Sequence, residues 1–425
     1  MRLSGTREFE LLKKIGFVRM AGTKEELQAA EILREEIKAI GFESELEPFE
    51  IEDAVVTAEF EVLEPYSKKY KVTGYKCCES TPEEGMICDF VYAEDMLDVN
   101  LADVRGKFVL VNGIVRMEQY RKLIKAGVAG FMTMNGSLLD KESETDLATR
   151  KIRAVLASCG LTKALNIRIA DAFDMIKRGA SKVKVTIKNK NEKRTSHNIY
   201  VTVPGTQKPE EVISFGAHYD SVEFSTGVYD NGAGSVILME ILRYFKENPP
   251  KRTVKFHWYG SEEIGLEGSK HFVKEHKDEL KNHKLMINVD VAGPVIGAEI
   301  AMVTADISLM HYVDYFMKTK GYAVKVKHDI YSSDCIPFAD NKVPAISFAR
   351  FAPHGGAFIH ERNDVIRYLS PDKLLGTTKY ILEFACEVIN SAAFPVPAEI
   401  PQEIVEKVDK YLYKKELEEN QKQEK

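Results

Sequence analysis

The first clear pattern of hydrophobic and polar positions lies near the N-terminus and predicts a helix followed by a strand. Thr23 and Glu26 stand in capping-box spacing, and apolar residues recur after them at helical intervals. We expect Gly41 to end this helix, and the alternation over residues 42–51 is typical of a strand. The apolar stripe consists of Leu27, Ala30, Leu33 and Ile37.

From about residue 57 the pattern changes to short apolar runs separated by a helical segment. The runs at 106–113 and 129–136 read as strands, and residues 116–127 between them have helical periodicity. This alternation predicts a small α/β insert over residues 57–181. A charged stretch at 188–198 then separates the insert from the next strand-like run.

Between residues 199 and 390, apolar strand-like runs alternate repeatedly with helical patterns. This rhythm predicts an α/β fold, with a mostly parallel mixed sheet between two layers of helices. We therefore expect residues 1–56 and 182–395 to form one discontinuous domain around the insert.

A helical tail is predicted over residues 396–425, with its last dozen residues frayed. Its apolar stripe predicts that this helix packs on the domain or binds a partner. The stripe is made of Ile404, Val408, Tyr411 and Leu412.

Composition and charge narrow the classes of function. The chain is 44% hydrophobic and 29% charged, which is typical of a globular enzyme. Its net charge of -6, with the two signs interspersed, argues against nucleic acid as a partner. We find no secretion signal and no apolar run long enough for a membrane span, so we expect a cytoplasmic protein. The six cysteines lack the spacing of a zinc knuckle and are expected to be reduced thiols.

Imidazole and carboxylate groups follow several of the predicted strands at the point where each strand ends. In an open α/β sheet, ligands bind at the carboxyl ends of the strands, so we expect these groups to meet at one edge. Nitrogen and carboxylate oxygen are the donors that zinc prefers in such mixed sites. The residues are His218, Asp220, Asp230, Glu262, Glu263, Asp290 and His360.

These residues lie in motifs that resemble those of the zinc aminopeptidases with two co-catalytic metals. This family includes aminopeptidase Y, the bacterial leucyl aminopeptidases and, more distantly, glutamate carboxypeptidase. The insert also resembles the protease-associated domain found in several members. That resemblance rests on its alternation of short strand-like runs with a helical segment and on no sequence motif. The motifs, in family order, are "HYD", "YDNGAG", "SEEIGLEGS", "NVDVAG" and "IHERNDV".

The resemblance implies a ligand set for two Zn²⁺ ions per chain, with Co²⁺ or Mn²⁺ as possible substitutes. In this scheme His218 and Asp290 hold one ion, and Glu263 and His360 hold the other. Asp230 bridges both, because its two oxygens can reach ions about 3.5 to 4 Å apart.

Two further acidic residues have other predicted roles. Asp220 lies two residues after His218 on an extended segment, so it can fix the tautomer of that imidazole. Glu262 precedes the ligand Glu263 and is expected to be the general base, since adjacent side chains point in different directions. The resemblance also implies a cis peptide bond after Asp230.

The segment before the last predicted strand resembles the part of the family that lines the substrate pocket, although packing roles are equally consistent with its residues. His354, in the loop before His360, is the one other histidine that could reach the site. The candidates in the segment are Tyr331, Asp334, Cys335, Ile336 and Phe338.

The sequence therefore predicts a dinuclear zinc aminopeptidase acting on peptides. The alternatives are a related metallo-carboxypeptidase, for which Arg350 or Arg362 could bind an acidic substrate, or a glutaminyl cyclase-like enzyme with one zinc. A binding protein that has lost catalysis is a third. Side-chain specificity, oligomeric state and the role of the insert stay open.

Overall fold

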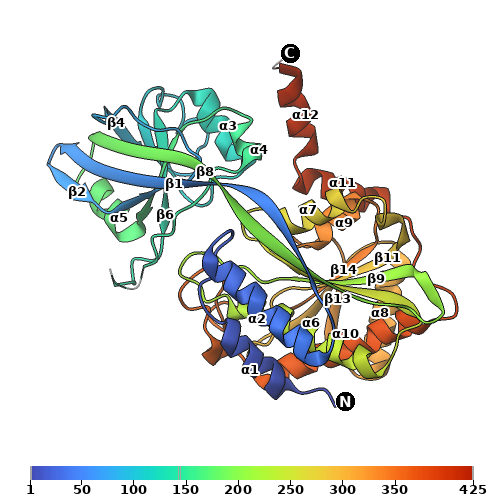
Figure 1. Ribbon diagram of the computed structural model, residues 1–425. Coiled ribbons are helices and arrows are strands. Elements are labelled where there is room, and N and C mark those ends of the chain that lie inside the picture. The colour runs from blue at the N-terminus through green and yellow to red at the C-terminus, as the bar shows by residue number, and fades with distance from the viewer. Residues whose placement is uncertain (1, 142, 144, 424–425) are drawn as a thin grey trace. The chain divides into compact units, whose positions relative to one another are not determined.

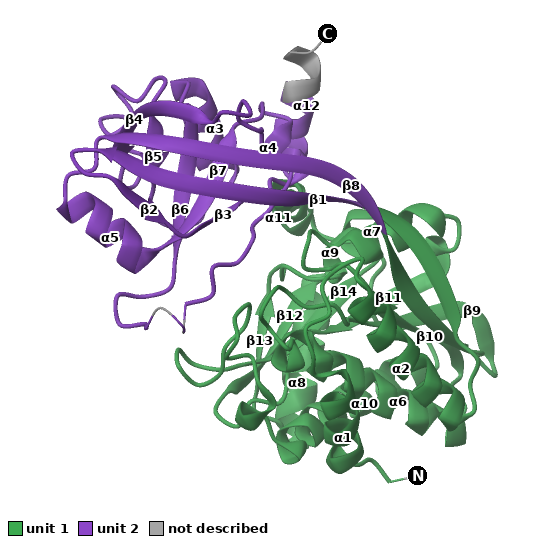
Figure 2. Cartoon of the chain, turned by 60° about the vertical axis from the view of Figure 1, so that its left-hand side comes forward, with its two compact units in different colours: residues 1–51, 195–412 green, residues 52–194, 413–425 purple. Residues whose placement is uncertain are grey.

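The computed structural model describes residues 2–141, 143 and 145–423, which form two compact units. Unit 1 contains residues 1–51 and 195–412, and unit 2 contains residues 52–194 and 413–425 (Figure 2). Each unit has its own hydrophobic core.

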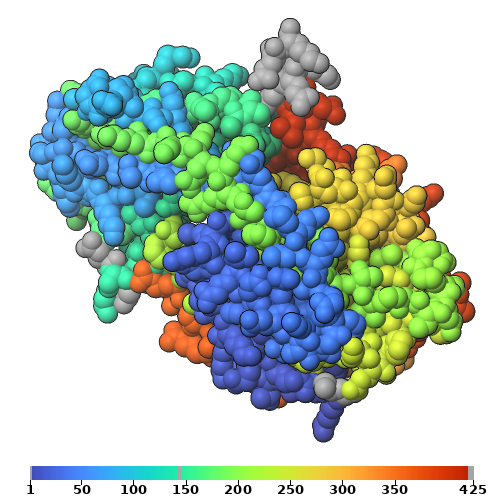
Figure 3. Space-filling model, viewed as in Figure 1, coloured from blue at the N-terminus to red at the C-terminus, as the bar shows by residue number. Residues whose placement is uncertain are grey.

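Unit 1 begins with two helices, α1 (Gly5–Ile15) and α2 (Lys24–Ile40). The predicted start and end of α2 are confirmed: the Thr23 side chain accepts the backbone N–H of Glu26, and Gly41 adopts φ 95°. The predicted apolar stripe is right except at Leu27, which is 37% exposed, whereas Glu26 is buried. The N-terminal segment, dark blue in Figure 3, lies on the outside of unit 1.

The sheet of unit 1 is mixed and mostly parallel, as predicted. Its four central strands are parallel to one another, while β12 runs antiparallel to β14 and β8 runs antiparallel to β10. In order across the sheet, the strands are β13 (Val324–His328), β12 (Ala298–Thr304), β14 (Ala345–Phe351), β11 (His283–Val289), β9 (Lys208–His218), β10 (Arg252–Tyr259) and β8 (Lys182–Val203).

Helices cover both faces of this sheet, which gives the predicted three-layer sandwich (Figure 1). One face packs against the largest apolar cluster, to which α1 and α2 contribute together with α6 (Ala233–Glu247), α8 (Ile307–Lys320) and α10 (Pro371–Asn390). The other face packs against α7 (Glu267–Glu275) and α9 (Cys335–Asp340). The loops at the strand ends are therefore carried by a scaffold that is packed on both sides.

Unit 2 is a smaller α/β unit, and the strands and helix predicted at 106–136 are confirmed. Strands β4 to β7 are parallel neighbours, and β3 joins β7 in the antiparallel sense. Around this sheet lie β2 (Lys68–Tyr70), paired with β1 (Glu45–Glu64), and several helices. The remaining elements are β3 (Val72–Gly74), β4 (Met86–Tyr92), β5 (Phe108–Leu110), α3 (Met117–Ala126), β6 (Gly130–Asn135), α4 (Ala154–Ala157), β7 (Lys163–Arg168) and α5 (Ile169–Lys177).

Two segments differ from the sequence-based expectation. The charged stretch at 188–198 is part of the long strand β8, in which exposed and less exposed positions alternate although few of them are apolar. Residues 414–423 form the helix α12 (Lys414–Gln423) rather than a frayed end, consistent with their Lys, Glu and Gln content. Residues 424–425 lie outside the described part.

The predicted C-terminal helix exists as α11 (Gln402–Tyr411), and it packs on unit 1. Its buried residue Val408 lies in one apolar cluster with Leu266, Ile336 and Ala339. Within the described residues, no helix has both the length and the apolar character needed to cross a membrane. All six cysteines are free thiols.

Candidate metal centre

The ends of neighbouring parallel strands place the predicted site residues at one edge of the unit 1 sheet. Strand β9 ends at His218, Asp290 follows β11, and the Glu262–Glu263 pair follows β10. His360 lies in the loop after β14 and adopts φ 58°. Because these four strands are adjacent, their loops converge.

One group of potential ligands consists of His218, Asp230 and Asp290, all buried. The Nε2 atom of His218 lies 3.2 Å from Oδ1 of Asp230 and 3.6 Å from Oδ1 of Asp290. That Asp290 oxygen is buried and accepts no hydrogen bond from the described residues. A buried carboxylate oxygen in this state is costly unless a cation compensates it, so the donors fit a metal ion.

A second group consists of Asp230, Glu263 and His360. The Nε2 atom of His360 lies 3.0 Å from Oδ2 of Asp230 and 3.1 Å from Oε2 of Glu263. Asp230 thus presents Oδ1 to the first group and Oδ2 to the second. One carboxylate shared in this way is the arrangement that two-metal sites require.

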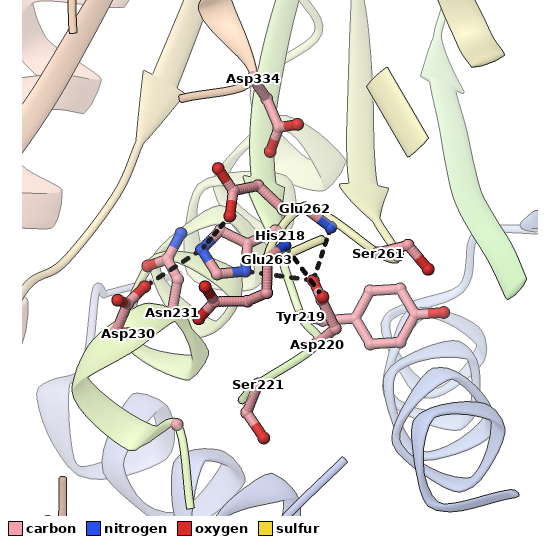
Figure 4. A network of polar contacts seen from close by, with 12 residues as sticks. His218, Tyr219, Asp220, Ser221, Asp230, Asn231, Ser261, Glu262, Glu263 and Asp334 are labelled. Carbon is pink, nitrogen blue, oxygen red and sulfur yellow. Dashed lines mark hydrogen bonds and ion pairs between the residues drawn. The ribbon is translucent and has the colours of Figure 1, made fainter. Parts of the chain in front are cut away.

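Asp220 belongs to neither group. Its carboxylate links His218 to the backbone of Glu262 and Glu263. Its Oδ1 lies 3.3 Å from Nδ1 of His218 and accepts the N–H of Glu262 at 3.0 Å. Its Oδ2 accepts the N–H of Glu263 at 3.2 Å. Figure 4 shows this carboxylate between the imidazole and the glutamate pair. Asp220 can therefore orient the ring of His218 and the backbone of both glutamates at once.

Glu262 and Glu263 leave their shared backbone in different directions (Figure 4). Glu263 is in the second group, whereas Oε2 of Glu262 approaches only to 3.9 Å from Nε2 of His218. Burial raises the pKa of the Glu262 carboxyl well above its usual value, and His218 only partly opposes this effect. Glu262 is thus placed beside the metal groups without belonging to either.

The carboxylates around both imidazoles raise the pKa values of the two rings. Burial acts to lower the pKa of His218, but the carboxylates around it, Glu262 first, raise that pKa well above the usual value. The pKa of His360 rises to about 11 in the same way, because Glu263 and Asp230 outweigh its desolvation. Metal binding must displace protons from these rings.

Two residues that the sequence analysis missed hold the Asp230 turn in place. Asp364 accepts the N–H of Tyr229 at 2.8 Å and that of Asp230 at 3.2 Å. The side chain of Asn231 donates to the carbonyl of Val289 and accepts the N–H of Val291. The peptide bond between Asp230 and Asn231 is cis, as the resemblance implied. Both missed residues lie inside the motifs "IHERNDV" and "YDNGAG", which is the signal that could have found them.

The candidates for pocket lining fall into two sets. Ile336 packs under α11, and Phe338 stacks on Phe272 in the aromatic core, so both have packing roles. Cys335 is likewise fully buried. Asp334 differs, since it is buried beside Glu262 in Figure 4 and accepts the Ser269 hydroxyl at 2.5 Å.

The two remaining candidates are Tyr331 and His354. The ring of Tyr331 contacts that of Phe351, the last residue of β14, at 5.7 Å between centroids. His354 is exposed and is not in either ligand group.

The fold resembles solved zinc aminopeptidases. The structure of a zinc aminopeptidase from Bacillus subtilis superimposes with a TM-score of 0.77 at 20% identity, covering 95% of this chain and 99% of that chain. At this identity the likeness concerns the fold alone.

Sequence comparison extends the likeness to curated proteins. Aminopeptidase YwaD of Bacillus subtilis is 24% identical over 376 residues, covering 84% of this chain and 78% of the relative. Human carboxypeptidase Q is 27% identical over 296 residues, covering 64% and 61% respectively.

The sequence profile of peptidase family M28 matches residues 198–385. This segment contains both ligand groups as well as Asp220, Glu262 and Asp364. The part of the chain that carries both ligand groups, residues 198–385, is thus similar to peptidase family M28.

Proposed function

We propose that the protein is an aminopeptidase that uses two Zn²⁺ ions to hydrolyse the first peptide bond of a peptide. The observation that carries this proposal is Asp230, whose two oxygens serve two separate groups of imidazole and carboxylate donors. The aminopeptidase relatives support the same reaction.

We assign His218 and Asp290 to one ion, Glu263 and His360 to the other, and Asp230 to both. The buried Asp290 oxygen without a hydrogen bond supports the fit of a cation there. When bound, such ions acidify water and polarise the scissile carbonyl. Nitrogen and oxygen donors of this kind also accept Co²⁺ and Mn²⁺, which we expect to substitute.

Glu262 acts as the general base in this scheme. Its carboxylate lies beside the first ligand group and is outside both, so it can take a proton from the attacking water. The same oxygen then delivers that proton to the departing amine.

Asp220 maintains the orientation that this chemistry needs. With its oxygen 3.3 Å from Nδ1 of His218, the carboxylate favours the tautomer protonated at that nitrogen. Nε2 then keeps its lone pair for the cation. The same carboxylate fixes the backbone of the base and of its neighbouring ligand.

Cleavage at the N-terminus follows from the charge of the substrate. A free α-amine is positively charged near neutral pH, and carboxylates crowd this edge of the sheet. Blocking the amine removes that attraction. We therefore expect the enzyme to require an unblocked first residue.

The decisive experiment compares the hydrolysis of amino-acid p-nitroanilides with free and acetylated amines, before and after chelation. We expect metal-dependent release from the free amines only, with about two zinc ions per chain. If no supplied metal restores release from any free-amine substrate, the proposal is wrong. A stoichiometry near one would instead favour a cyclase-like enzyme.

A metallo-carboxypeptidase is the second candidate, supported by the likeness to carboxypeptidase Q. It requires a cation for the substrate's carboxylate. Arg350 is already committed, because it is buried, pairs with Glu299 at 3.2 Å and donates to the carbonyl of Pro294. Peptides with a blocked amine and a free carboxylate separate the two activities, since a carboxypeptidase cleaves them.

A further inference from the structure

A fully buried arginine from the N-terminal segment holds the loop that separates two of the proposed metal ligands. Arg19 follows α1 in the chain and is 0% exposed. It lies outside the segment that matches family M28. The loop that it contacts covers residues 219–227 and connects His218 to the Asp230 turn.

The guanidinium group donates to backbone carbonyls at both ends of this loop. Its Nε donates to the carbonyl of Tyr219, directly after His218. At the other end, Nη1 donates to Thr226 at 2.5 Å and Nη2 to Gly227 at 2.7 Å. Each of these bonds spans two hundred or more positions of the chain.

The guanidinium group of Arg19 also binds the N-terminal segment to which Arg19 belongs. Nη1 also donates to the carbonyls of Ile15, at 3.0 Å, and Phe17, at 3.1 Å. The backbone of Arg19 exchanges two further hydrogen bonds with Ser221, through the hydroxyl at 3.0 Å and the N–H at 3.2 Å. Arg19 alone thus forms hydrogen bonds with four residues of the loop, which are Tyr219, Ser221, Thr226 and Gly227.

The fit is close enough to constrain the loop. Gly227 has φ 58°, and a Cβ atom there would lie 3.0 Å from Nη2 of Arg19 and 2.6 Å from Cβ of Ser221. Burying a guanidinium is costly unless its donors are satisfied, and here backbone carbonyls satisfy them. The carboxylates of Asp364 and Asp220 attract the charge through space only.

We infer that Arg19 is a positioning residue that sets the separation between His218 and Asp230, and through it the geometry of the metal centre. The inference rests on the proposed function, in which these two residues share an ion. A guanidinium with five donors in a fixed plane can hold both ends of the loop together. An ammonium group has three donors and cannot span the same carbonyls.

Arg252 provides a matched control in the same unit. It is also 0% exposed and also donates to backbone carbonyls, those of Val388, Ile389 and Ser391 at the end of α10. None of these residues belongs to the ligand groups. Arg252 differs in also pairing with Glu211 at 2.5 Å, and Arg252→Met removes a buried arginine without touching the 219–227 loop.

The experiment measures zinc affinity by chelator competition, and the visible absorption of the Co²⁺ form, for Arg19→Met, Arg19→Lys and Arg252→Met. Thermal melting of the metal-free proteins reports the loss of stability in each. We expect Arg19→Met to weaken zinc binding roughly 10–100-fold and to change the Co²⁺ spectrum. Arg19→Lys should recover only part of the affinity, and Arg252→Met should keep both readouts at wild-type values.

Two results would overturn the inference. One is zinc affinity and a Co²⁺ spectrum in Arg19→Met that match those of Arg252→Met. The other is full recovery by Arg19→Lys, which would show that charge alone matters. If Arg19→Met does not fold, Arg19→Lys against Arg252→Met decides by the same criteria. Failure of the proposed function would appear separately, as an absence of hydrolysis or of two ions in the wild-type protein.

Discussion

The adjacent residues Glu262 and Glu263 allow a test in which the same isosteric change has two different outcomes. Glu262→Gln removes the proposed base but none of the proposed ligands, since Oε2 of Glu262 is in neither ligand group. Glu263→Gln replaces a ligand oxygen that lies 3.1 Å from Nε2 of His360. Both side chains keep their size, so packing changes little.

The expected magnitudes follow from these positions. Loss of a general base costs roughly 10²–10⁴-fold in kcat, which corresponds to about 2.7–5.4 kcal/mol of transition-state free energy. Metal content in Glu262→Gln should stay at the wild-type value. In Glu263→Gln the site loses one charged donor of its second group, so zinc affinity should fall by at least ~10-fold, and activity with it.

The assay combines kcat for leucine p-nitroanilide with zinc per chain measured by atomic emission on the same dialysed samples. Circular dichroism melts establish that both variants are folded. The reasoning is refuted if Glu262→Gln loses metal, if it keeps turnover within about tenfold of wild type, or if Glu263→Gln retains its metal.

Three further predictions concern the groups around the site and the core. Asp220→Asn should weaken zinc binding roughly 10–100-fold in chelator competition, because an amide N–H₂ then faces a donor; unchanged affinity would contradict the role given to Asp220. Zinc affinity should rise with pH in calorimetric titrations, because the raised pKa values of His218 and His360 mean that binding displaces protons; a flat profile would contradict this. Burial raises the pKa of Glu8 to about 8 from 4.5, so the folded state keeps a proton that the unfolded state loses. The unfolding free energy should fall as pH rises through that window, by up to about 1.4 kcal/mol per pH unit, and Glu8→Gln should flatten this slope in urea melts.

Sequence patterns predicted which imidazole and carboxylate groups meet at one edge of the sheet because the relevant rule is local. His218 is the last residue of a strand, Asp290 follows one directly, and the glutamate pair is separated from one by two residues; neighbouring parallel strands bring such positions together. The mostly parallel mixed sheet was predicted from the alternation of strand-like runs with helical patterns along the chain.

The roles of Glu26 and Arg19, two buried charged residues that hold the backbone near the site, could not be predicted in this way. Glu26 was interpreted as part of a capping box, yet its carboxylate accepts the N–H of Gly22, the hydroxyl of Ser196 and the N–H of Ser261. Arg19 likewise acts on a loop about two hundred positions away. A buried charge with distant backbone partners leaves no periodic signal in the sequence.

The long strand β8 shows another limit of hydrophobic patterning. Its charged middle part carries too few apolar residues to be recognised as a strand, although exposed and shielded positions alternate along it. Pairing with β4 and β10 involves residues 182–185 and 199–203, the more apolar ends of β8, and β1 is a further backbone partner of the strand. We predicted the insert to end at residue 181 for the same reason.

The dispersal of the proposed ligands along the chain determines when the centre can arise during synthesis. His360, the last of them, lies beyond β14, the final strand of the unit 1 sheet. A polypeptide still emerging from the ribosome therefore lacks part of the second group until the whole unit 1 sheet has been translated. Incomplete translation products that stop before this point cannot assemble the shared site, so hydrolytic capacity is confined to chains that have completed the sheet.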